Sequence, residues 1–296
     1  MARHLSKKIL TQVQTFFDHN DGNVYGSRAL TEIFNSHRQV WQLPWDLTYR
    51  AFLEGLLGQT QMRRFSLQSA QYGSVTRFAW GDVSDYEVAL SIRPNSFLTH
   101  GTAVFLHALT DQVPSIVYVN KEQGDKPEGT GVSQATIDRA FARPQRRSNY
   151  LLRYGNVRIL LVSGKATGRL GVVPFTLPNS AVVQVTSIER TLIDLVVRPA
   201  YAGGVFEVLK VFRAARDRAS LPLLLGMLRQ LNYSYPYHQV LGFYMEVSGY
   251  PVPAVNELRS LGMQFDFYLA HGIGDKVYVP AWRLFIPRGF PTAAQS

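Results

Sequence analysis

Residues 186–204 read TSIERTLIDLVVRPAYAGG, a stretch that predicts one helix with a defined start. Thr186 is followed three residues later by Glu189, which is the spacing of a capping box. In such a box the hydroxyl and the carboxylate satisfy the first free N–H groups of the helix. Arg190 and Asp194 are four residues apart, so we expect them to pair across one turn on the exposed side of the helix.

The sequence around this helix predicts a mixed α+β domain. The helix ends at the step from Arg198 to Pro199, because proline disfavours the α conformation in the residue before it. Strand patterns precede the helix at residues 115–120, 157–162 and 181–185, and helical patterns follow at 204–217, 221–231 and 235–248. This order of elements is typical of the α+β class.

Length and composition favour a protein of two domains without a membrane span. A chain of 296 residues can hold two domains, since a single core usually stops growing at a few hundred residues. No apolar run is long enough to cross a bilayer, and residues 1–8 lack the apolar stretch of a secretory signal. We therefore expect a cytoplasmic protein with no membrane partner. The absence of cysteine removes disulfides, thiolate nucleophiles and thiolate zinc sites.

The charge balance favours a polyanionic partner. The chain has 31 Lys and Arg against 21 Asp and Glu, for a formal charge of +10 and a pI near 9.8. Nucleic acid is the commonest polyanion inside a cell. On charge alone, the alternative is a basic protein without such a partner. Arginine outnumbers lysine, which favours specific phosphate or base contacts over a diffuse positive cloud.

Residues 1–82 have the element order of a winged helix-turn-helix domain. Helical spacing and capping residues predict three helices, over residues 5–17, 27–35 and 44–58. On the third helix, which we expect to begin at Pro44, Trp45 is assigned to the buried face. Alternating patterns at residues 61–67 and 74–80 predict a hairpin. The third helix would enter the major groove of DNA, and the hairpin would contact the backbone.

Basic residues lie where DNA binding by such a domain needs them. Any one of these arginines alone would be an ordinary surface charge, but together they favour DNA. The exposed side of the third helix is poor in Asn, Gln and Arg, the usual readers of base edges. Sequence discrimination would therefore depend on one threonine, one arginine and the shape of the DNA. The predicted DNA-binding residues are Arg28, Thr48, Arg50, Arg63, Arg64 and Arg77.

Residues 83–296 are expected to form a larger, mixed α+β domain, which holds the most charged segment of the chain. Between residues 138 and 170, eight Lys and Arg face a single acid, Asp138. This segment is either a solvated helix end and loop or a second face that contacts phosphates. The possible secondary nucleic-acid face consists of Arg143, Arg146, Arg147 and Arg153. The main rival to a DNA-binding protein is an RNA-binding or protein-interaction module that uses this segment.

No pattern of catalytic residues stands out in the sequence. The seven histidines show no H-E-x-x-H or similar metal spacing. His100 and His107 lack a nearby carboxylate that would complete a metal site. Neither a Gly-x-x-x-x-Gly-Lys frame nor a G-x-S-x-G elbow is present. We therefore expect a protein that is not an enzyme and has no cofactor and no metal.

Several segments between about residues 85 and 290 resemble the antitoxins of AbiE-type (AbiEi), the DNA-binding halves of type IV toxin–antitoxin pairs. One is the helix at residues 186–204. The others are YEVALSIRP at 86–94, FLTHGTA at 97–103, YPYHQ at 235–239, GFY at 242–244, FDFYL at 265–269 and WRL at 282–284. In residues 1–82 the resemblance is one of layout.

This resemblance implies a specific biological role. The protein would be a transcriptional repressor that occupies inverted repeats in the promoter DNA of its own operon. It would counteract a toxin of nucleotidyltransferase type, and such pairs have been linked to abortive infection and phage defence. The resemblance assigns DNA binding to the first domain and antitoxicity to the second. It also implies that antitoxin and toxin act without a stable complex.

Overall fold

The computed structural model describes residues 4–20, 22–124 and 131–292 of the chain, which divides into two compact units. Unit 1 comprises residues 1–96, 149–160 and 176–183, and unit 2 comprises residues 97–148, 161–175 and 184–296. Both units contain helices and strands, so the predicted α+β class is confirmed. The expected boundary at residues 82 and 83 falls within the first segment of unit 1.

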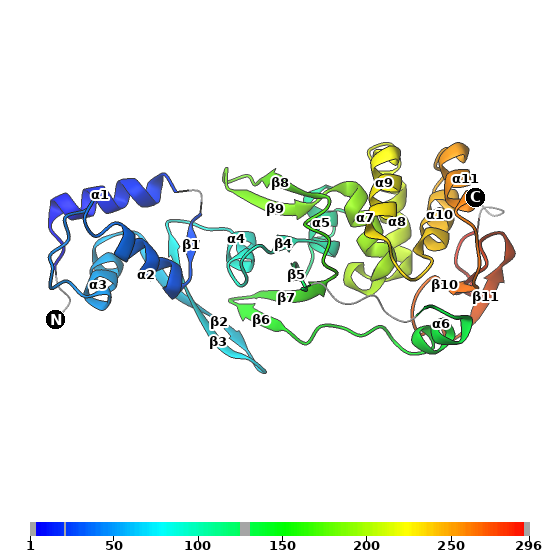
Figure 1. Ribbon diagram of the computed structural model, residues 1–296, viewed down its shortest axis with the longest axis horizontal. Helices are drawn as coiled ribbons and strands as arrows, with labels where there is room; N and C mark the ends of the chain where they lie inside the picture. The colour runs from blue at the N-terminus through cyan, green and yellow to red at the C-terminus, as the bar shows by residue number, and fades with distance from the viewer. Residues whose placement is uncertain (1–3, 21, 125–130, 293–296) are drawn as a thin grey trace. The chain divides into compact units, whose positions relative to one another are not determined.

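Unit 1 begins with three helices and a hairpin, coloured blue to cyan in Figure 1. In chain order its elements are α1 (Lys7–Asp18), β1 (Val24–Tyr25), α2 (Ser27–Ser36), α3 (Tyr49–Gln59), β2 (Met62–Ser69), β3 (Gly73–Trp80), α4 (Asp85–Leu90), β6 (Leu151–Tyr154) and the first half of β7 (Val157–Gly164). The strands lie in the order β1-β3-β2-β6-β7, and all neighbours are antiparallel. The predicted hairpin is therefore present as β2 and β3.

The core of unit 1 is built from aromatic side chains of the helices and the base of the hairpin. The rings of Phe17 on α1 and Trp80 on β3 stack at 4.9 Å. The ring of Trp41, in the connection between α2 and α3, stacks on Phe52 of α3 at 5.9 Å. Because these large apolar surfaces are removed from water, they hold the three helices against the strands.

The third helix begins later than predicted. Thr48 is its N-cap and accepts a hydrogen bond from the backbone N–H of Ala51 at 3.2 Å, so α3 starts at Tyr49 and not at Pro44. The assignment of Trp45 to the buried face is wrong, since its side chain is 91% exposed. Leu47, only 2% exposed, fills the core instead. The helix signal at Pro44 is wrong because residues 44–47 form a turn, closed by a hydrogen bond from the Leu47 N–H to the Pro44 carbonyl at 3.0 Å, and Thr48 caps the helix that follows.

Unit 2 contains most of the remaining elements. They are β4 (Phe97–Leu98), α5 (His100–Leu106), β5 (Ile116–Glu122), α6 (Gln134–Phe141), the second half of β7, β8 (Val172–Thr176), β9 (Val182–Thr186), α7 (Ile188–Val197), α8 (Val205–Ala215), α9 (Leu221–Leu231), α10 (Tyr237–Val247), α11 (Val252–Ser260), β10 (Phe267–Tyr268), β11 (Lys276–Val279) and β12 (Leu284–Pro287). The last three strands form a small sheet of their own in the order β10-β12-β11.

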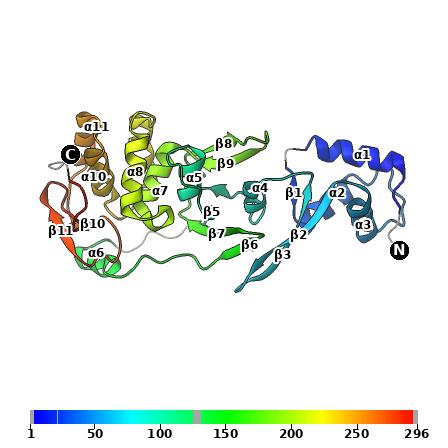
Figure 2. The ribbon, with the colours of Figure 1, turned by 180° about the vertical axis from the view of Figure 1, so that it is seen from behind.

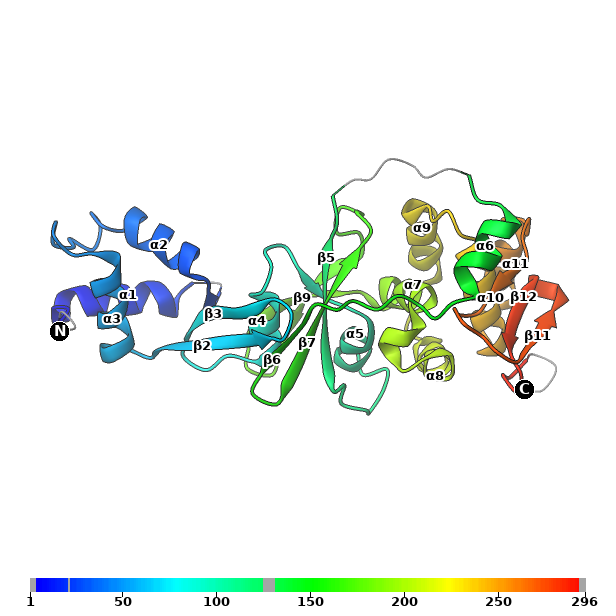
Figure 3. The same ribbon diagram turned by 90° about the horizontal axis from the view of Figure 1, so that it is seen from below.

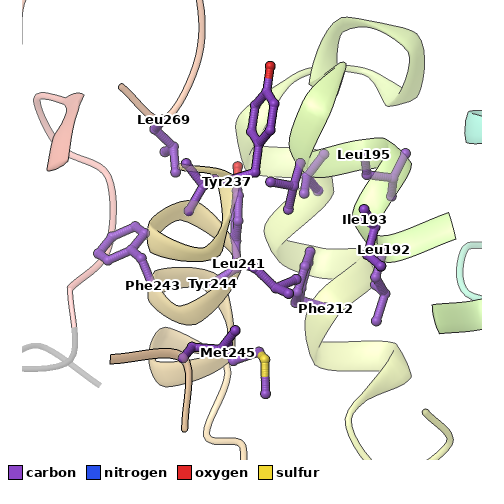
Figure 4. Packing of buried hydrophobic residues seen from close by; sticks show 14 of the residues in the cluster. Leu192, Ile193, Leu195, Phe212, Tyr237, Leu241, Phe243, Tyr244, Met245 and Leu269 are labelled. Carbon is purple, nitrogen blue, oxygen red and sulfur yellow. The ribbon is translucent and has the colours of Figure 1, made fainter. Parts of the chain in front are cut away.

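The core of unit 2 lies among α7, α8 and α10, which Figure 2 shows close together. The rings of Phe212 on α8 and Tyr244 on α10 stack at 4.9 Å, and Leu192 of α7 belongs to the same cluster (Figure 4). At Gly242, α10 approaches the Trp282 ring so closely that a Cβ atom there would lie 2.1 Å from the ring. The segment thus requires a residue without a side chain.

The helix in residues 186–204 is present as α7, with two corrections to its predicted details. Its N-cap is Ser187 and not Thr186, and Glu189 accepts a hydrogen bond from the Ser187 hydroxyl at 2.9 Å. The Arg190–Asp194 pair exists but is buried and not exposed. Nearly every residue of α7 is buried, because other elements cover it on all sides. The predicted end is confirmed, since α7 stops at Val197, two residues before Pro199.

Candidate nucleic-acid interface

The starts of α2 and α3 lie together. The hydroxyl of Tyr49, the first residue of α3, donates a hydrogen bond to the backbone carbonyl of Ser27, the first residue of α2, at 3.3 Å. Arg28 and Arg50 follow directly in the two helices, and their side chains are 93% and 89% exposed. The structure therefore brings two of the predicted site residues to the same end of the helix pair.

Both arginines have only weak partners within the protein. Arg28 pairs with Glu32 at 2.9 Å, and Arg50 pairs with Glu54 at 3.2 Å, each across one helical turn. Exposed pairs of this kind contribute about 0.3–0.5 kcal/mol, so a phosphate can replace the glutamate at little expense. A positive charge in the first turn also opposes the helix dipole, which means that helix stability does not explain these arginines.

The arginines of the hairpin differ from one another. Arg63 and Arg64 are consecutive in β2, so their side chains lie on opposite faces of the sheet. The Arg63 guanidinium donates to the Gly81 carbonyl at 2.7 Å and to Asp82 at 3.1 Å. The Arg64 guanidinium lies 5.8 Å from the centre of the Phe78 ring, and no carboxylate within residues 4–20, 22–124 and 131–292 pairs with it. Arg64 is the better placed of the two to meet a phosphate.

Arg77 is held within the protein. Its guanidinium donates to the carbonyl of Ser91 at 2.9 and 3.0 Å and to that of Ile92 at 3.3 Å, just beyond the end of α4. Partial burial, and then the nearby charge of Arg93, lower the pKa of Arg77. A cation at this position satisfies carbonyl groups that the last turn of a helix leaves free. Its donors are thus engaged in the fold.

Arg64 and Arg153, from two different predicted groups, lie on the same face of the sheet in unit 1. In β2, Arg64 and Gln68 share a face because side chains alternate with a period of two. Gln68 lies opposite Arg153 of β6, and Arg153 lies opposite Arg158 of β7. Directly opposite residues in an antiparallel pair project to the same face. Figure 3 shows β2, β3 and β6 beside one another.

The other residues of the basic segment 138–170 lie in different structural environments. Arg143, Arg146 and Arg147 are exposed in the extended stretch that follows α6 in unit 2. Lys165 donates to the carbonyls of Leu231 and Asn232, and Arg169 donates to Gln184. Arg153 and Arg158 belong to unit 1. The segment is therefore divided between the two units, and two of its cations support the fold of unit 2.

A pocket of about 860 Å³ opens in unit 2 beside α5 and β5. Its lining includes the rings of Tyr118 and Tyr201 and the side chain of Arg147, but also the acids Glu207 and Asp275. These carboxylates oppose the entry of a polyanion. Unit 1 is therefore the better candidate for the nucleic-acid interface.

The sequence did not mark Trp45 as an exposed side chain, and it placed Arg158 in the basic segment 138–170 without setting it opposite Arg153. Trp45 lies in the loop before α3, where Arg38 donates to the carbonyls of Pro44 and Trp45 at 2.8 and 2.5 Å. Pro44 and Asp46 are residue types common in turns, and Thr48 is a good N-cap, so these residues are the signal that could have shown the loop. The place of Arg158 depends on strand pairing, for which the sequence carried no signal.

The described residues also bear on a membrane span and on a metal site. No described helix is both long enough and apolar enough to cross a membrane. Within the same residues, no group of three or more histidine, aspartate or glutamate side chains is arranged to bind a metal ion.

Comparison with known proteins yields a likeness in fold. No family model matches the chain, and no curated protein matches it. The crystal structure of the RV2827C protein from Mycobacterium tuberculosis is similar to this chain, with a TM-score of 0.54 at 12% sequence identity. The match covers 99% of this chain and 95% of that chain. At this identity the similarity concerns the fold alone.

Proposed function

We propose that unit 1 contains a winged helix-turn-helix domain that binds promoter DNA, and that the protein is a transcriptional repressor. The order α1-β1-α2-α3-β2-β3 is that of such a domain, and β1 pairs with β3 as the third strand of its small sheet. The observation that carries the proposal is the hydrogen bond between Tyr49 and Ser27, which sets Arg28 and Arg50 at one exposed end of the helix pair.

The proposed mode of binding follows from these positions. The first turn of α3 enters the major groove, where Arg50 meets base edges and Thr48 holds the helix start. Arg28 contacts a phosphate from the start of α2, and Arg64 contacts the backbone from the hairpin. Arg77 takes no part, because its donors are engaged with the end of α4. Repression results from exclusion of RNA polymerase from the occupied promoter.

The resemblance over residues 85–290 supports a more specific proposal, in which the protein is the antitoxin of a type IV pair. It would repress its own operon through inverted repeats and counteract a nucleotidyltransferase-like toxin without forming a stable complex with it. A repressor acts where the chromosome is, so the proposal includes a cytoplasmic location.

DNA binding is tested by titrating the full-length protein with three probes of equal length. The probes are the duplex upstream of its own gene, an unrelated duplex and a structured RNA. We expect the upstream duplex to bind most tightly and the R28A/R50A double variant to lose that preference. The matched control is R213A/R218A, which removes the same charge from exposed sites in unit 2 outside the basic segment. Tightest binding to the RNA, lost in an R146A/R147A variant, would favour the rival function instead.

The antitoxin role predicts that a neighbouring gene encodes a nucleotidyltransferase-like toxin, and co-expression of the protein with that toxin tests the role. We expect the full-length protein to restore growth, and R28A/R50A to restore it equally well, because antitoxicity is assigned to the second domain. Affinity purification of tagged protein should recover no toxin. Continued growth arrest in the presence of soluble wild-type protein would exclude the antitoxin role while leaving DNA binding intact.

A further inference from the structure

We propose that one face of the sheet in unit 1 is a second phosphate-binding surface for the same DNA duplex, beside the segment that α3 contacts. This sheet face consists of Arg64, Ser66, Gln68, Thr76, Arg153 and Arg158. The inference rests on the proposed function and extends it. It adds β6 and β7, from a distant part of the sequence, to an interface otherwise made by residues 1–82.

The register of the strands builds this face. Gln68 of β2 lies opposite Arg153 of β6, which in turn lies opposite Arg158 of β7. On the other side of β2, Ser66 lies opposite Thr76 of β3. Arg64 lies four residues along β2 from Gln68, so its Cα atom is roughly 14 Å from that of Arg153 by strand geometry. Arginines at that separation can contact two separate phosphates of one DNA duplex.

The chemistry of the sheet face suits phosphates. The four strands contain no acidic residue at all. Between the arginines stand neutral hydroxyl and amide groups, Ser66, Gln68 and Thr76, which are common donors to phosphate oxygens. The side chains of Arg64 and Arg153 are exposed, and neither pairs with a carboxylate of the described residues. A polyanion would thus meet only positive charge and hydrogen-bond donors.

Two arginines lie directly opposite each other on this face. Arg153 and Arg158 form such a cross-strand pair, and like charges in this arrangement destabilise a sheet. A bound phosphate between the two guanidinium groups would reverse the sign of the interaction, since each group can donate two parallel hydrogen bonds to it.

The opposite face of the same strands is largely taken up by the fold. Leu67, Leu152 and Ile159 project to that side and are fully buried. Arg77, also on that side, is bonded to the end of α4. The face that carries Arg64 and Arg153 is the more open of the two. Its exposed positive charges and the neighbouring α3 favour the backbone of a DNA duplex as the partner.

The test compares double variants of the full-length protein on the upstream duplex over a range of salt concentrations. R64A/R153A should reduce the slope of log K against log salt by about 1.8, the value for two phosphate contacts. The preference for the upstream over the unrelated duplex should be unchanged. Hydroxyl-radical footprinting should show lost protection at backbone positions next to the main site. R64K/R153K should keep the slope of the wild type, and R213A/R218A should keep both slope and footprint.

The outcomes separate this inference from the proposed function. If R28A/R50A weakens binding while R64A/R153A leaves slope and footprint unchanged, the proposed role of the sheet face is overturned. The proposed repressor function is then still supported. If the wild type binds no duplex, both fall. If R64A/R153A lowers the melting temperature, the single variants R153K and R153A provide the test. Equal slopes of log K against log salt for these two variants would overturn the inference.

Discussion

Arg190 donates a hydrogen bond to Asp194 at 2.9 Å inside unit 2, where the two side chains are 2% and 7% exposed. The other oxygen of Asp194 accepts a hydrogen bond from the Thr99 hydroxyl at 3.1 Å. The pair thus links α7 to the residue that precedes α5. A buried pair of this kind is sensitive to the loss of one partner, because the other is left as an uncompensated charge.

Asp194→Ala should destabilise the protein by about 3–5 kcal/mol, since it leaves the buried Arg190 cation without its carboxylate partner. The double variant R190M/D194L should lose much less. Glu257→Ala is the matched control, because it breaks the exposed pair with Arg229, and we expect a loss of about 0–1 kcal/mol there. Urea unfolding measures all three. An equal loss for the buried and exposed pairs would contradict this account.

The stability of the protein should fall as the pH decreases from 6.5 towards 4. Complete burial lowers the pKa of His100 to about 4, against the opposing effect of Asp194. The folded state therefore holds His100 neutral, while the unfolded chain takes up a proton below its ordinary value of 6.5. The stability that neutral His100 contributes is present above pH 6.5, and on the order of 3 kcal/mol is lost by pH 4.

The variant His100→Asn tests this pH dependence. Asn cannot titrate, and it tolerates the left-handed backbone of this position, where φ is 49°. The free energy of unfolding should therefore change less between pH 6.5 and 4 than in the wild type. Chemical unfolding at fixed pH values gives both curves, and parallel curves would show that another group is responsible.

Arg77→Met should lower stability without changing the salt dependence of DNA binding. The substitution removes the hydrogen bonds to the carbonyls of Ser91 and Ile92, and bonds of a charged donor contribute about 1.5–3 kcal/mol. Thermal unfolding and salt titrations measure the two effects. A reduced salt slope with unchanged stability would instead place Arg77 among the phosphate contacts.

Arg28 and Arg50 should differ in what they contribute to binding. Arg28→Ala removes one phosphate contact, so we expect equal weakening on all duplexes and a slope lower by about 0.9. Arg50→Ala removes a contact to base edges, which should reduce discrimination against the unrelated duplex by about 1–3 kcal/mol. Competition titrations with both duplexes separate these effects. If Arg50→Ala changed only overall affinity, α3 would not be the reader.

Trp45 provides an optical signal for the same interface. The chain has four tryptophans, and Trp41, Trp80 and Trp282 are buried, whereas Trp45 is 91% exposed. Iodide should therefore quench Trp45 selectively, and bound DNA should protect it because it precedes α3. Trp45→Phe should abolish the quenchable fraction. Unchanged quenching in the presence of saturating upstream duplex would separate Trp45 from the interface.

Local signals in the sequence predicted many of the elements, and the structure shows why some boundaries shifted. The hairpin of β2 and β3 and the end of α7 before Pro199 agree with their patterns. The observed N-cap of α7 is Ser187, one residue after the predicted Thr186. Both residue types cap helices well, and the local sequence does not distinguish them. The helix α11 was missed because Pro251 and Pro253 hide its short pattern.

The amino-acid sequence by itself determined the mixed class, the order of helices and strands in the first 80 residues, and a positive charge suited to a polyanion. These properties depend on residue type and on contacts over a few positions. Tertiary structure alone decided that Arg190 and Asp194 are buried, that Arg77 serves the fold, and that Arg64 and Arg153 share a face. Burial and strand register depend on which distant segments pack together, and local patterns do not contain that choice.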